Sequence, residues 1–227
     1  MLILALDTSS RWTSCALVDP DRGVVAESLH APPEKAGEIL PGALVDLCGG
    51  DLARVDALAV GLGPGSFTGL RVGLASLKAI AYARELPLAG ASSLRALALA
   101  AGGTGLIVPT LEARKGELYA SAIEGGAMVV PETVMPAASL PAFVERLHRP
   151  ATVVGPGARA NRASLGGLPV VDEPVAPLAR CVAQLCAAGL RGARHDRNAV
   201  FALAPEYLSA LAAEVALAEG RVGGLSG

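Results

Sequence analysis

The sequence predicts an α/β protein with two subdomains, each built on a mixed sheet flanked by helices. Three observations lead to this fold class. Residues 1–101 alternate short apolar runs with amphipathic stretches, a pattern typical of strands and helices in turn. A glycine-rich segment, Gly102–Gly105, follows and is the best candidate for a linker. After it, the order of strands and helices is repeated loosely. We therefore expect one domain over residues 1–103 and a smaller, degenerate one over 104–204.

Three antiparallel strands are expected first. The apolar run Leu2–Leu6 ends at Asp7, and turn-forming residues separate it from a second run, Ser14–Val18. Asp19–Gly23 has the composition of a tight turn, and Val24–His30 is the third run.

Helices and a parallel strand complete the first half. Apolar spacing predicts a helix over Glu34–Cys48, and Ala57–Leu62 is a short apolar run typical of a buried parallel strand. The loop Gly63–Thr68 leads into a helix over Gly69–Arg84, and a third helix is expected near Ser92–Ala101. The order strand, strand, strand, helix, strand, helix is that of the ribonuclease-H-like unit, which actin-like ATPases and sugar kinases use twice.

The second half repeats this order without obvious sequence identity. Its expected strands are Leu106–Leu111, Glu117–Ile123, Met128–Val134 and Thr152–Val154. Its expected helices are Leu140–His148 and Pro177–Ala188, followed by a last helix over about 205–219 that should pack back on the first domain.

Composition excludes several classes of protein. With 52% hydrophobic, 3% aromatic and 18% charged residues, the chain is not disordered, collagen-like or a disulfide scaffold.

The start MLILALD has no basic leader, and no stretch approaches ~20 uninterrupted apolar residues, so we expect neither a signal peptide nor a membrane span. The four cysteines form no C-x-x-C pair, which indicates reduced thiols in a cytoplasmic protein. The three histidines form no helical pair, so no metal is expected. The net charge of −2 argues against a chain that holds nucleic acid by itself.

Two loops carry residues suited to chemistry. Asp7, Thr8 and Ser9 follow the first strand, where an acid can hold a metal-bound water while hydroxyls and amides face phosphate oxygens. The same residues also form ordinary turns, and both interpretations stay open. The second loop is more specific, and its candidate nucleotide- or phosphate-binding residues are Gly63, Gly65, Ser66, Thr68 and Gly69.

In this second loop, Ser66 or Thr68 can cap the following helix, whose free amides form an anion site. The loop is neither a Walker A motif nor a dinucleotide fingerprint, because the lysine and the glycine spacing are wrong. A purely structural turn before the helix is the alternative.

The helix after this loop is apolar nearly all round. One stripe is Leu70, Leu74, Leu77 and Ala81, and the circumference continues with Val72, Ala75, Ala79, Ile80 and Ala83. Such a helix must be buried on more than its sheet side. It is either central in its domain or, with the Glu34–Cys48 helix, a docking face for another subunit. We assign to that partner or dimer face Ile39, Leu40, Ala43, Leu44, Leu47, Arg71, Val72, Leu74, Ala75, Lys78, Ala79 and Tyr82.

Two charged clusters have simpler interpretations. Glu112–Glu117 lies at the first expected hairpin of the second half, which matches Asp7–Ser10 in the first, and a charged hairpin is usually a solvated turn. The basic cluster is Arg191, Arg194, His195 and Arg197. A solvated face is the simpler interpretation and an RNA-phosphate contact the alternative.

The segments ILALDTSS, GLGPGSFTGLRVGLASLKAIA, ASSLRALA and LEARKGELYA, in this order, resemble the bacterial TsaB (YeaZ) family. The resemblance covers residues 1 to about 125, and PEYL at Pro205–Leu208 is similar to the family's C-terminal tyrosine segment. It implies the actin-like ATPase superfamily. It also implies a non-catalytic scaffold or activator in forming N6-threonylcarbamoyladenosine at position 37 of tRNAs that read codons beginning with A. The implied partners are the catalytic subunit TsaD and the ATPase TsaE. The free chain would form a homodimer through the same helical face, and tRNA would be reached through the complex. The resemblance implies no catalytic residue, cofactor or metal.

The chain departs from the family pattern at three positions. Lys35 stands where a histidine commonly precedes the I-L-P of the first helix, Glu112 replaces an aspartate, and Ser209 stands where an arginine often follows Y-L. The roles of these three residues are therefore open. In TsaD-like enzymes a histidine pair on the first helix holds the metal, so its absence here agrees with a non-catalytic subunit.

Two other functions compete with this one. Asp7 favours an ATP-binding enzyme of the ATPase or sugar-kinase type, but Glu112–Arg114 replaces the second D-x-G-S/T loop, and Val153–Gly157 only weakly resembles an adenosine-binding loop. The third possible function is that of a metallopeptidase, a label attached to relatives. This sequence has no paired histidines that could hold the metal of such an enzyme. The scaffold hypothesis predicts that Leu74→Glu or Ala75→Arg abolishes pairing with TsaD and leaves the monomer folded.

Overall fold

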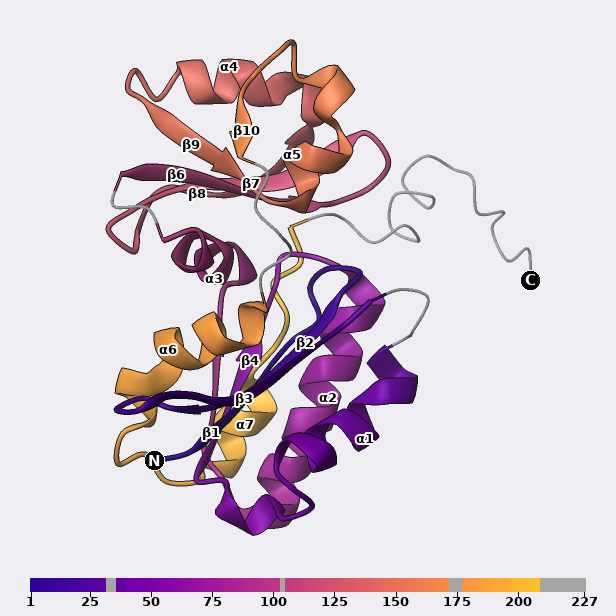
Figure 1. Cartoon of the computed structure of the whole chain (residues 1–227), viewed down its shortest axis with the longest axis vertical. Helices are drawn as coiled ribbons and strands as arrows, with labels where there is room; N and C mark the ends of the chain where they lie inside the picture. The colour runs from indigo at the N-terminus through magenta and orange to yellow at the C-terminus, as the bar shows by residue number, and fades with distance from the viewer. Residues whose placement is uncertain (32–35, 103–104, 172–176, 209–227) are drawn as a thin grey trace, which may run out of the picture.

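The computed structural model describes residues 1–31, 36–102, 105–171 and 177–208. The chain forms two five-stranded mixed sheets that lie one above the other along the long axis (Figure 1). The strand orders are β3-β2-β1-β4-β5 and β8-β7-β6-β9-β10, so the two halves share one topology. The predicted α/β fold with two ribonuclease-H-like sheets is confirmed.

The first sheet consists of β1 (Ile3–Asp7), β2 (Thr13–Asp19), β3 (Gly23–His30), β4 (Ala57–Gly61) and β5 (Leu88–Ala91). β1 pairs antiparallel with β2 and parallel with β4, and both β1 and β4 are fully buried because helices cover the two faces of the sheet. The sequence pattern did not indicate β5, because the strand has only four residues, LAGA, and none of them is β-branched.

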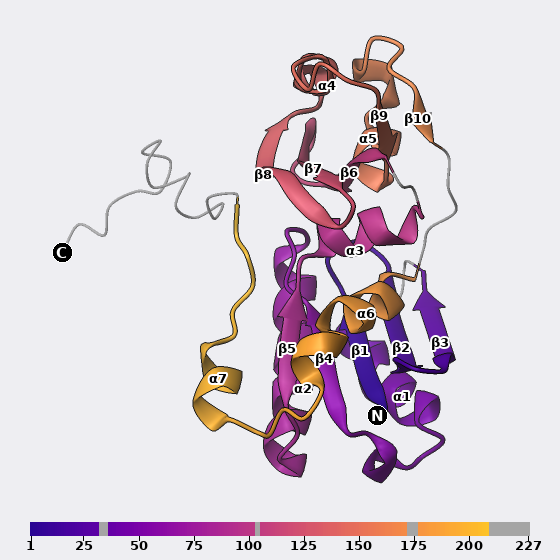
Figure 2. The same cartoon turned by 90° about the vertical axis from the view of Figure 1, so that its left-hand side faces the viewer.

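On one face of this sheet lie α1 (Ala36–Leu47), η1 (Leu52–Arg54) and α2 (Phe67–Arg84). On the other face lie α3 (Ser93–Ala100) and α6 (Leu178–Leu190). Figure 2 shows α3 between the two sheets, where it contacts both α6 and β6.

The second sheet consists of β6 (Leu106–Glu112), β7 (Glu117–Glu124), β8 (Ala127–Pro136), β9 (Ala151–Val154) and β10 (Val170–Val171). Its short helices are η2 (Ala137–Ser139), α4 (Leu140–Glu145), α5 (Pro156–Ala160) and η3 (Arg162–Ser164). The sequence analysis did not predict α5 or β10, which have five and two residues. The helix expected to reach His148 ends at Glu145, and His148 has a left-handed backbone with φ of 54°.

The position of α6 corrects the expected extent of the second domain. We placed Pro177–Ala188 in the second domain, but α6 packs on β1, β2, β4 and β5 of the first sheet. Its buried side chains share one core with Ile3 and Ala5, and Ser14 Oγ accepts a hydrogen bond of 3.0 Å from the backbone N of Ala179. After the second sheet the chain comes back to the first sheet, and α6 covers the face of that sheet opposite α1 and α2. A boundary near residue 103 stays a prediction.

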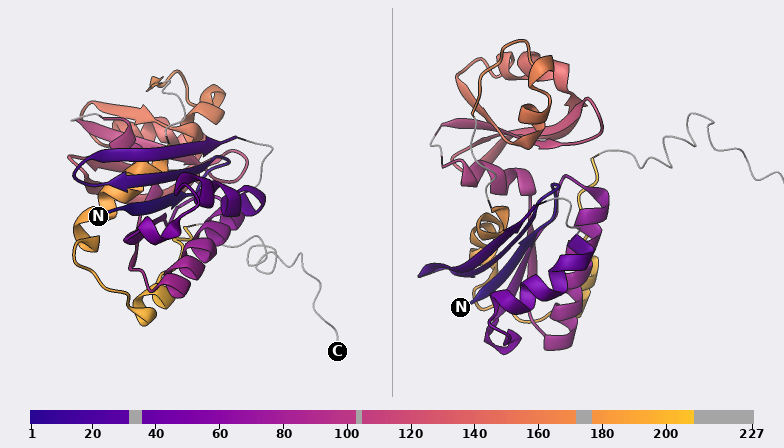
Figure 3. Two further views of the ribbon diagram at one scale, coloured as in Figure 1. Left: turned by 60° about the horizontal axis from the view of Figure 1, so that its bottom comes forward. Right: turned by 45° about the vertical axis from the view of Figure 1, so that its right-hand side comes forward.

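The last described residues lie on the α2 side of the first sheet. After α6 the chain passes to α7 (Arg197–Ala202), a helix the sequence analysis missed, and continues to residue 208 beside α2 (Figures 1 and 3). We name Asp196–Tyr207 the C-terminal strap. Val200 of the strap is buried in the core that α1 and α2 share with the sheet. The helix expected over 205–219 does not include residues 205–208, which are not helical, and its remainder lies outside the described residues.

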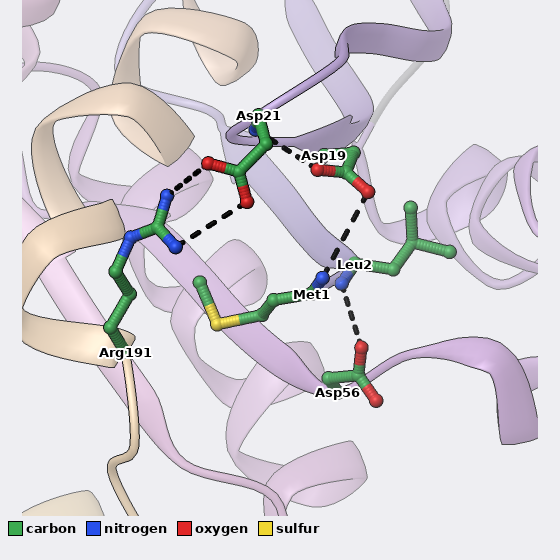
Figure 4. A network of polar contacts seen from close by, with 6 residues as sticks. All are labelled: Met1, Leu2, Asp19, Asp21, Asp56 and Arg191. Atoms are coloured by element: carbon green, nitrogen blue, oxygen red, sulfur yellow. Dashed lines mark hydrogen bonds and ion pairs between the residues drawn. The ribbon is translucent and has the colours of Figure 1, made fainter.

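Ion pairs and hydrogen bonds connect the start of the chain, through the turn that holds Asp19 and Asp21, to Arg191 at the end of α6 (Figure 4). The Met1 amino group lies 3.9 Å from Asp19, and the Leu2 backbone N donates to Asp56 at 2.8 Å. Arg191 donates two hydrogen bonds to the Asp21 carboxylate, and this contact lowers the pKa of Asp21. One member of the expected basic cluster, Arg191, is therefore neutralised within the chain.

Two further expectations concern the cysteines and membrane spans. The four cysteines are buried and free, and burial raises the pKa of Cys15 to about 11 and of Cys186 to about 12, which keeps both thiols protonated. Among the described helices, none combines the length and the apolar character that crossing a bilayer requires.

Candidate functional site

The carboxylate of Asp7 is held by groups of the chain itself. Asp7 ends β1 and is 1% exposed. Its Oδ1 accepts hydrogen bonds from the backbone N of Ser9 at 3.0 Å and from Ser9 Oγ at 2.7 Å, and its Oδ2 accepts from Ser93 Oγ at 2.6 Å. Ser93 Oγ in turn accepts from the backbone N of Gly63 at 3.2 Å. Asp7 therefore joins the first hairpin to α3 and to the glycine-rich loop.

The two loops predicted to hold phosphate pack on each other. The backbone N of Ser66 donates to the carbonyl of Ser9 at 2.6 Å, and Thr8 Oγ1 donates to the carbonyl of Gly69 at 2.8 Å. A Cβ on Gly65 would lie 2.1 Å from the carbonyl oxygen of Ser9, so only glycine fits there. The structure thus brings Thr8, Ser9 and the Gly63–Gly69 loop together as one packed unit, which favours the structural interpretation of both loops.

The start of α2 is capped by its own sequence, as predicted. Ser66 Oγ accepts a hydrogen bond of 3.2 Å from the backbone N of Gly69, while Thr68 is exposed and makes no cap. The Ser66 hydroxyl thus already accepts a hydrogen bond from one of the free backbone N–H groups at the start of α2. An anion bound at this helix end would need the same N–H groups as donors.

A cavity of about 190 Å³ opens between the two sheets. It is lined by Asp7, Ser10, Trp12, Ser14, Leu29, Leu97, Ala100, Ala101, Leu111, Val154, Gly155, Pro156, Arg159, Pro177, Leu178 and Arg180. Apolar side chains make up most of this wall, and the guanidinium groups of Arg159 and Arg180 supply positive charge. Arg180 is paired with Glu27 at 3.4 Å. A cavity with this lining suits a small, partly apolar anion.

The hairpin that follows β6 contributes little to the cavity. Leu111 lines it, whereas Glu112, Arg114 and Lys115 are exposed to solvent. Lys35 and Ser209, the other two departures from the family pattern, lie outside the described residues.

The predicted helical face divides into a buried and an accessible part. Leu40, Leu44 and Leu74 are 1%, 4% and 6% exposed and belong to the core of this chain, so assigning them to a partner surface was wrong. The half-buried members are Ile39, Ala43, Leu47, Val72 and Lys78, and the exposed members are Arg71, Ala75, Ala79 and Tyr82. Leu74→Glu would place a charge in the core, so it does not test docking without unfolding.

The accessible part carries mostly small side chains. Ala75 and Ala79 lie one turn apart on the exposed side of α2. On α1, which packs beside α2 (Figure 3), Pro41, Gly42 and Val45 are exposed. We name these five residues the α1–α2 seam. Their low bulk lets a helix of another chain approach closely.

Glu132 belongs to a polar cluster that the sequence analysis missed. It lies on β8, accepts a hydrogen bond from Ser92 Oγ and shares one with Glu206 of the C-terminal strap. Burial, helped by the hydrogen bond and charge of Glu206, raises the pKa of Glu132 to about 7, while Ser92 and Arg95 oppose the shift. No spacing rule in the sequence connects these distant positions.

This pKa gives a pH dependence to the stability of the fold. Because the folded-state pKa is raised, the contribution of protonated Glu132 is full below its ordinary value of 4.5 and is lost as the pH rises through about 7. Glu132→Gln, which mimics the protonated acid, should therefore raise Tm at pH 8 by about 2–4 °C and have little effect at pH 4. Calorimetric melting from pH 4 to 9 measures this, and a variant with the same pH profile as the natural chain would contradict it.

Comparisons with known proteins find similarity to proteins of tRNA modification. A family model described as TsaD, tRNA N6-adenosine threonylcarbamoyltransferase, matches residues 35–163. The tRNA threonylcarbamoyladenosine biosynthesis protein TsaB of Escherichia coli K12 is 38% identical over 124 residues, which are 52% of this chain and 53% of that protein. The chain spans about half the length of the curated TsaB proteins it matches, 53% in two of them.

Two further relatives match over more of their length. An uncharacterized protein of Mycobacterium tuberculosis is 34% identical over 179 residues, which cover 77% of this chain and 80% of that protein. The structure of YeaZ from Pseudomonas aeruginosa superposes with a TM-score of 0.70 at 26% identity and covers 91% of this chain and 99% of that one.

Proposed function

Because the chain belongs to the TsaB (YeaZ) family, we propose that it is a non-catalytic scaffold subunit in the formation of N6-threonylcarbamoyladenosine in tRNA. In this proposal it acts by docking a TsaD-type catalytic subunit on the α1–α2 seam. A TsaE-type ATPase joins the complex, and tRNA is held largely by the partners.

The observation that carries the proposal is the exposure of small residues on α2. The helix buries Leu70, Leu74 and Leu77 against the sheet and leaves Ala75 and Ala79 exposed on the outer side. A solvated helix face normally carries charged or long polar side chains, whereas small residues are typical of helices that approach a partner closely. The seam therefore has the character of an interface.

The state of Asp7 supports a non-catalytic role. Its two oxygens already accept three hydrogen bonds from Ser9 and Ser93, and the glycine-rich loop is packed against the same hairpin. An acid held in this way stabilises the arrangement of the loops, and three of its roughly four acceptor sites are already used within the chain.

The experiment that tests the proposal is reconstitution with and without this chain. The chain is co-purified with the TsaD-type subunit and tRNA of the same organism, the TsaE-type subunit, ATP and an activated threonylcarbamoyl donor are added, and threonylcarbamoyladenosine in the tRNA is measured. We expect the modification to depend on this chain. Undiminished modification in its absence would overturn the proposal.

The cavity beside Asp7 favours a second candidate, an ATP-binding enzyme of the same superfamily. Arg159 and Arg180 offer positive charge to phosphates, and Trp12 offers a ring to a base. We nevertheless expect isothermal titration of the isolated chain with Mg-ATP to show no micromolar binding, because the Asp7 oxygens are already hydrogen-bonded. Micromolar binding that is lost in Arg159→Ala would instead support the enzyme.

A further inference from the structure

Aromatic side chains gather on one surface beside α2. The chain has only three Phe, three Tyr and one Trp. Four of these seven lie along α2 and the C-terminal strap, namely Phe67, Tyr82, Phe201 and Tyr207, with exposed fractions of 36%, 38%, 74% and 43%. Exposed aromatic rings concentrated in one place are typical of binding surfaces.

Each of these four rings lies close to the cationic group of an arginine or a lysine. At the start of α2 the Arg71 guanidinium lies 3.9 Å from the centre of the Phe67 ring, and Arg71 Nε donates to Tyr207 Oη at 3.0 Å. The rings of Phe67 and Tyr207 are 5.2 Å apart. The end of the strap is thus held to α2 by cation–π contacts of Arg71, a hydrogen bond and a tilted contact between two rings.

Two similar contacts follow along the helix. Lys78 Nζ donates to the carbonyl of Phe201 at 2.8 Å and lies 5.8 Å from its ring. Arg197 Nε donates to Tyr82 Oη, and its guanidinium lies 5.2 Å from the Tyr82 ring. The strap and α2 therefore present a row of cations and rings that borders the α1–α2 seam.

The cations of this row have no acidic partner in the described part of the chain. The polar and cation–π partners of Arg71, Lys78 and Arg197 among the described residues are rings, phenol oxygens and a carbonyl oxygen. Three arginines elsewhere on the surface are paired with carboxylates: Arg149 with Glu124, Arg180 with Glu27 and Arg191 with Asp21. The row thus carries positive charge that a partner with carboxylates would complement.

We propose that the C-terminal strap is the second wall of the docking face and binds an acidic, partly apolar segment of the TsaD-type subunit. This inference rests on the proposed function, since it extends the same face beyond α1 and α2. The rings of Phe201 and Tyr207 act as anchors, and the three cations select the acidic partner.

The contacts favour a protein over a single-stranded nucleic acid as the occupant. Stacking of bases needs open ring faces, but Arg71 already covers one face of Phe67. The row is also continuous with the small residues Ala75 and Ala79, which suit a helix. Glu206, next to Tyr207 in the strap, is exposed and would repel phosphates.

The charge part of the proposal is tested by measuring the Kd of the complex with the TsaD-type subunit. For the double variant Lys78→Glu/Arg197→Glu we expect Kd to rise by about tenfold or more at about 50 mM salt, and the effect to shrink at about 0.5 M. Arg22→Glu/Arg146→Glu is the matched control, because both arginines are exposed on other parts of the surface. The control should bind like the natural chain.

The aromatic part is tested with neutral variants. Phe201→Ala removes a ring that is mostly exposed, so the fold should keep its Tm while Kd rises by about tenfold. Leu99→Ala, at a position 44% exposed on α3, is the control. Tyr207→Phe keeps the ring and removes only the hydroxyl bonded to Arg71, and it should raise Kd less than Phe201→Ala.

The outcomes separate this inference from the proposed function. If Ala75→Arg weakens pairing but the strap variants bind normally, the strap proposal is overturned and the proposed function stands. If no variant of either group weakens pairing, the proposed docking face itself fails. If the charge reversals abolish binding of tRNA to the isolated chain, or its self-association, and leave pairing unchanged, the occupant is different and the inference is wrong.

Discussion

Ala75→Arg is expected to abolish pairing with the TsaD-type subunit, with a rise in Kd of about a hundredfold or more. Ala75 is exposed in the free chain, so the arginine extends into solvent and the fold is kept. In the complex the same side chain would enter a close helix contact, where it has no room and its charge loses water. Titration of the labelled chain with the TsaD-type subunit measures the change.

A matched substitution on the opposite side of the sheet controls for the added charge and bulk. Ala188 is an exposed alanine of α6, and Ala188→Arg should leave both Tm and Kd unchanged. Equal affinities of the two variants would mean that the seam is not the docking surface.

Gly69→Ala is expected to lower the free energy of unfolding by about 2–4 kcal/mol. Its Cβ would lie 2.2 Å from the carbonyl oxygen of Thr8. That oxygen belongs to the backbone directly after β1, and Thr8 Oγ1 is bonded to the Gly69 carbonyl at 2.8 Å, so neither segment moves freely. Urea unfolding followed by circular dichroism gives the difference.

The control for this prediction is a second glycine within a helix. Gly42 of α1 has nothing within 4 Å of an added Cβ. Gly42→Ala should therefore stabilise the chain by about 0.5–1 kcal/mol, because alanine favours the helical backbone. The two substitutions should thus have opposite signs, and a Gly69→Ala variant as stable as Gly42→Ala would show that α2 does not approach the first hairpin this closely.

The sequence predicted the elements that are long enough to show a hydrophobic periodicity of their own. The runs of β1, β2 and β3 and the long helix α2 were located within a few residues, and the cap at Ser66 was identified. The missed elements are short, such as β5 with four residues and β10 with two. Such segments carry too few residues for a periodicity and are held by their neighbours.

Burial on α2 shows a second limit of sequence reasoning. Leu74 and Ala75 are adjacent, yet Leu74 faces the core and Ala75 faces solvent. A helix that is apolar nearly all round has no polar side that marks its outer face. The periodicity therefore predicted burial on more than one side of the helix, but it did not indicate which residues face solvent. The same limit placed Leu40 and Leu44 wrongly on the partner surface.

The sequence by itself determined the two ribonuclease-H-like halves, the family resemblance and the hypothesis of a docking face on α1 and α2. These depend on residues close together in the chain, whose spacing selects strand, helix or cap. Only the tertiary structure decided that α6 covers the first sheet, that Asp7 is held by Ser93, and that the C-terminal strap lies along α2. The residues involved are far apart, 86 positions for Asp7 and Ser93 and 136 for Arg71 and Tyr207. Packing of the whole chain brings such residues together, and no local pattern encodes it.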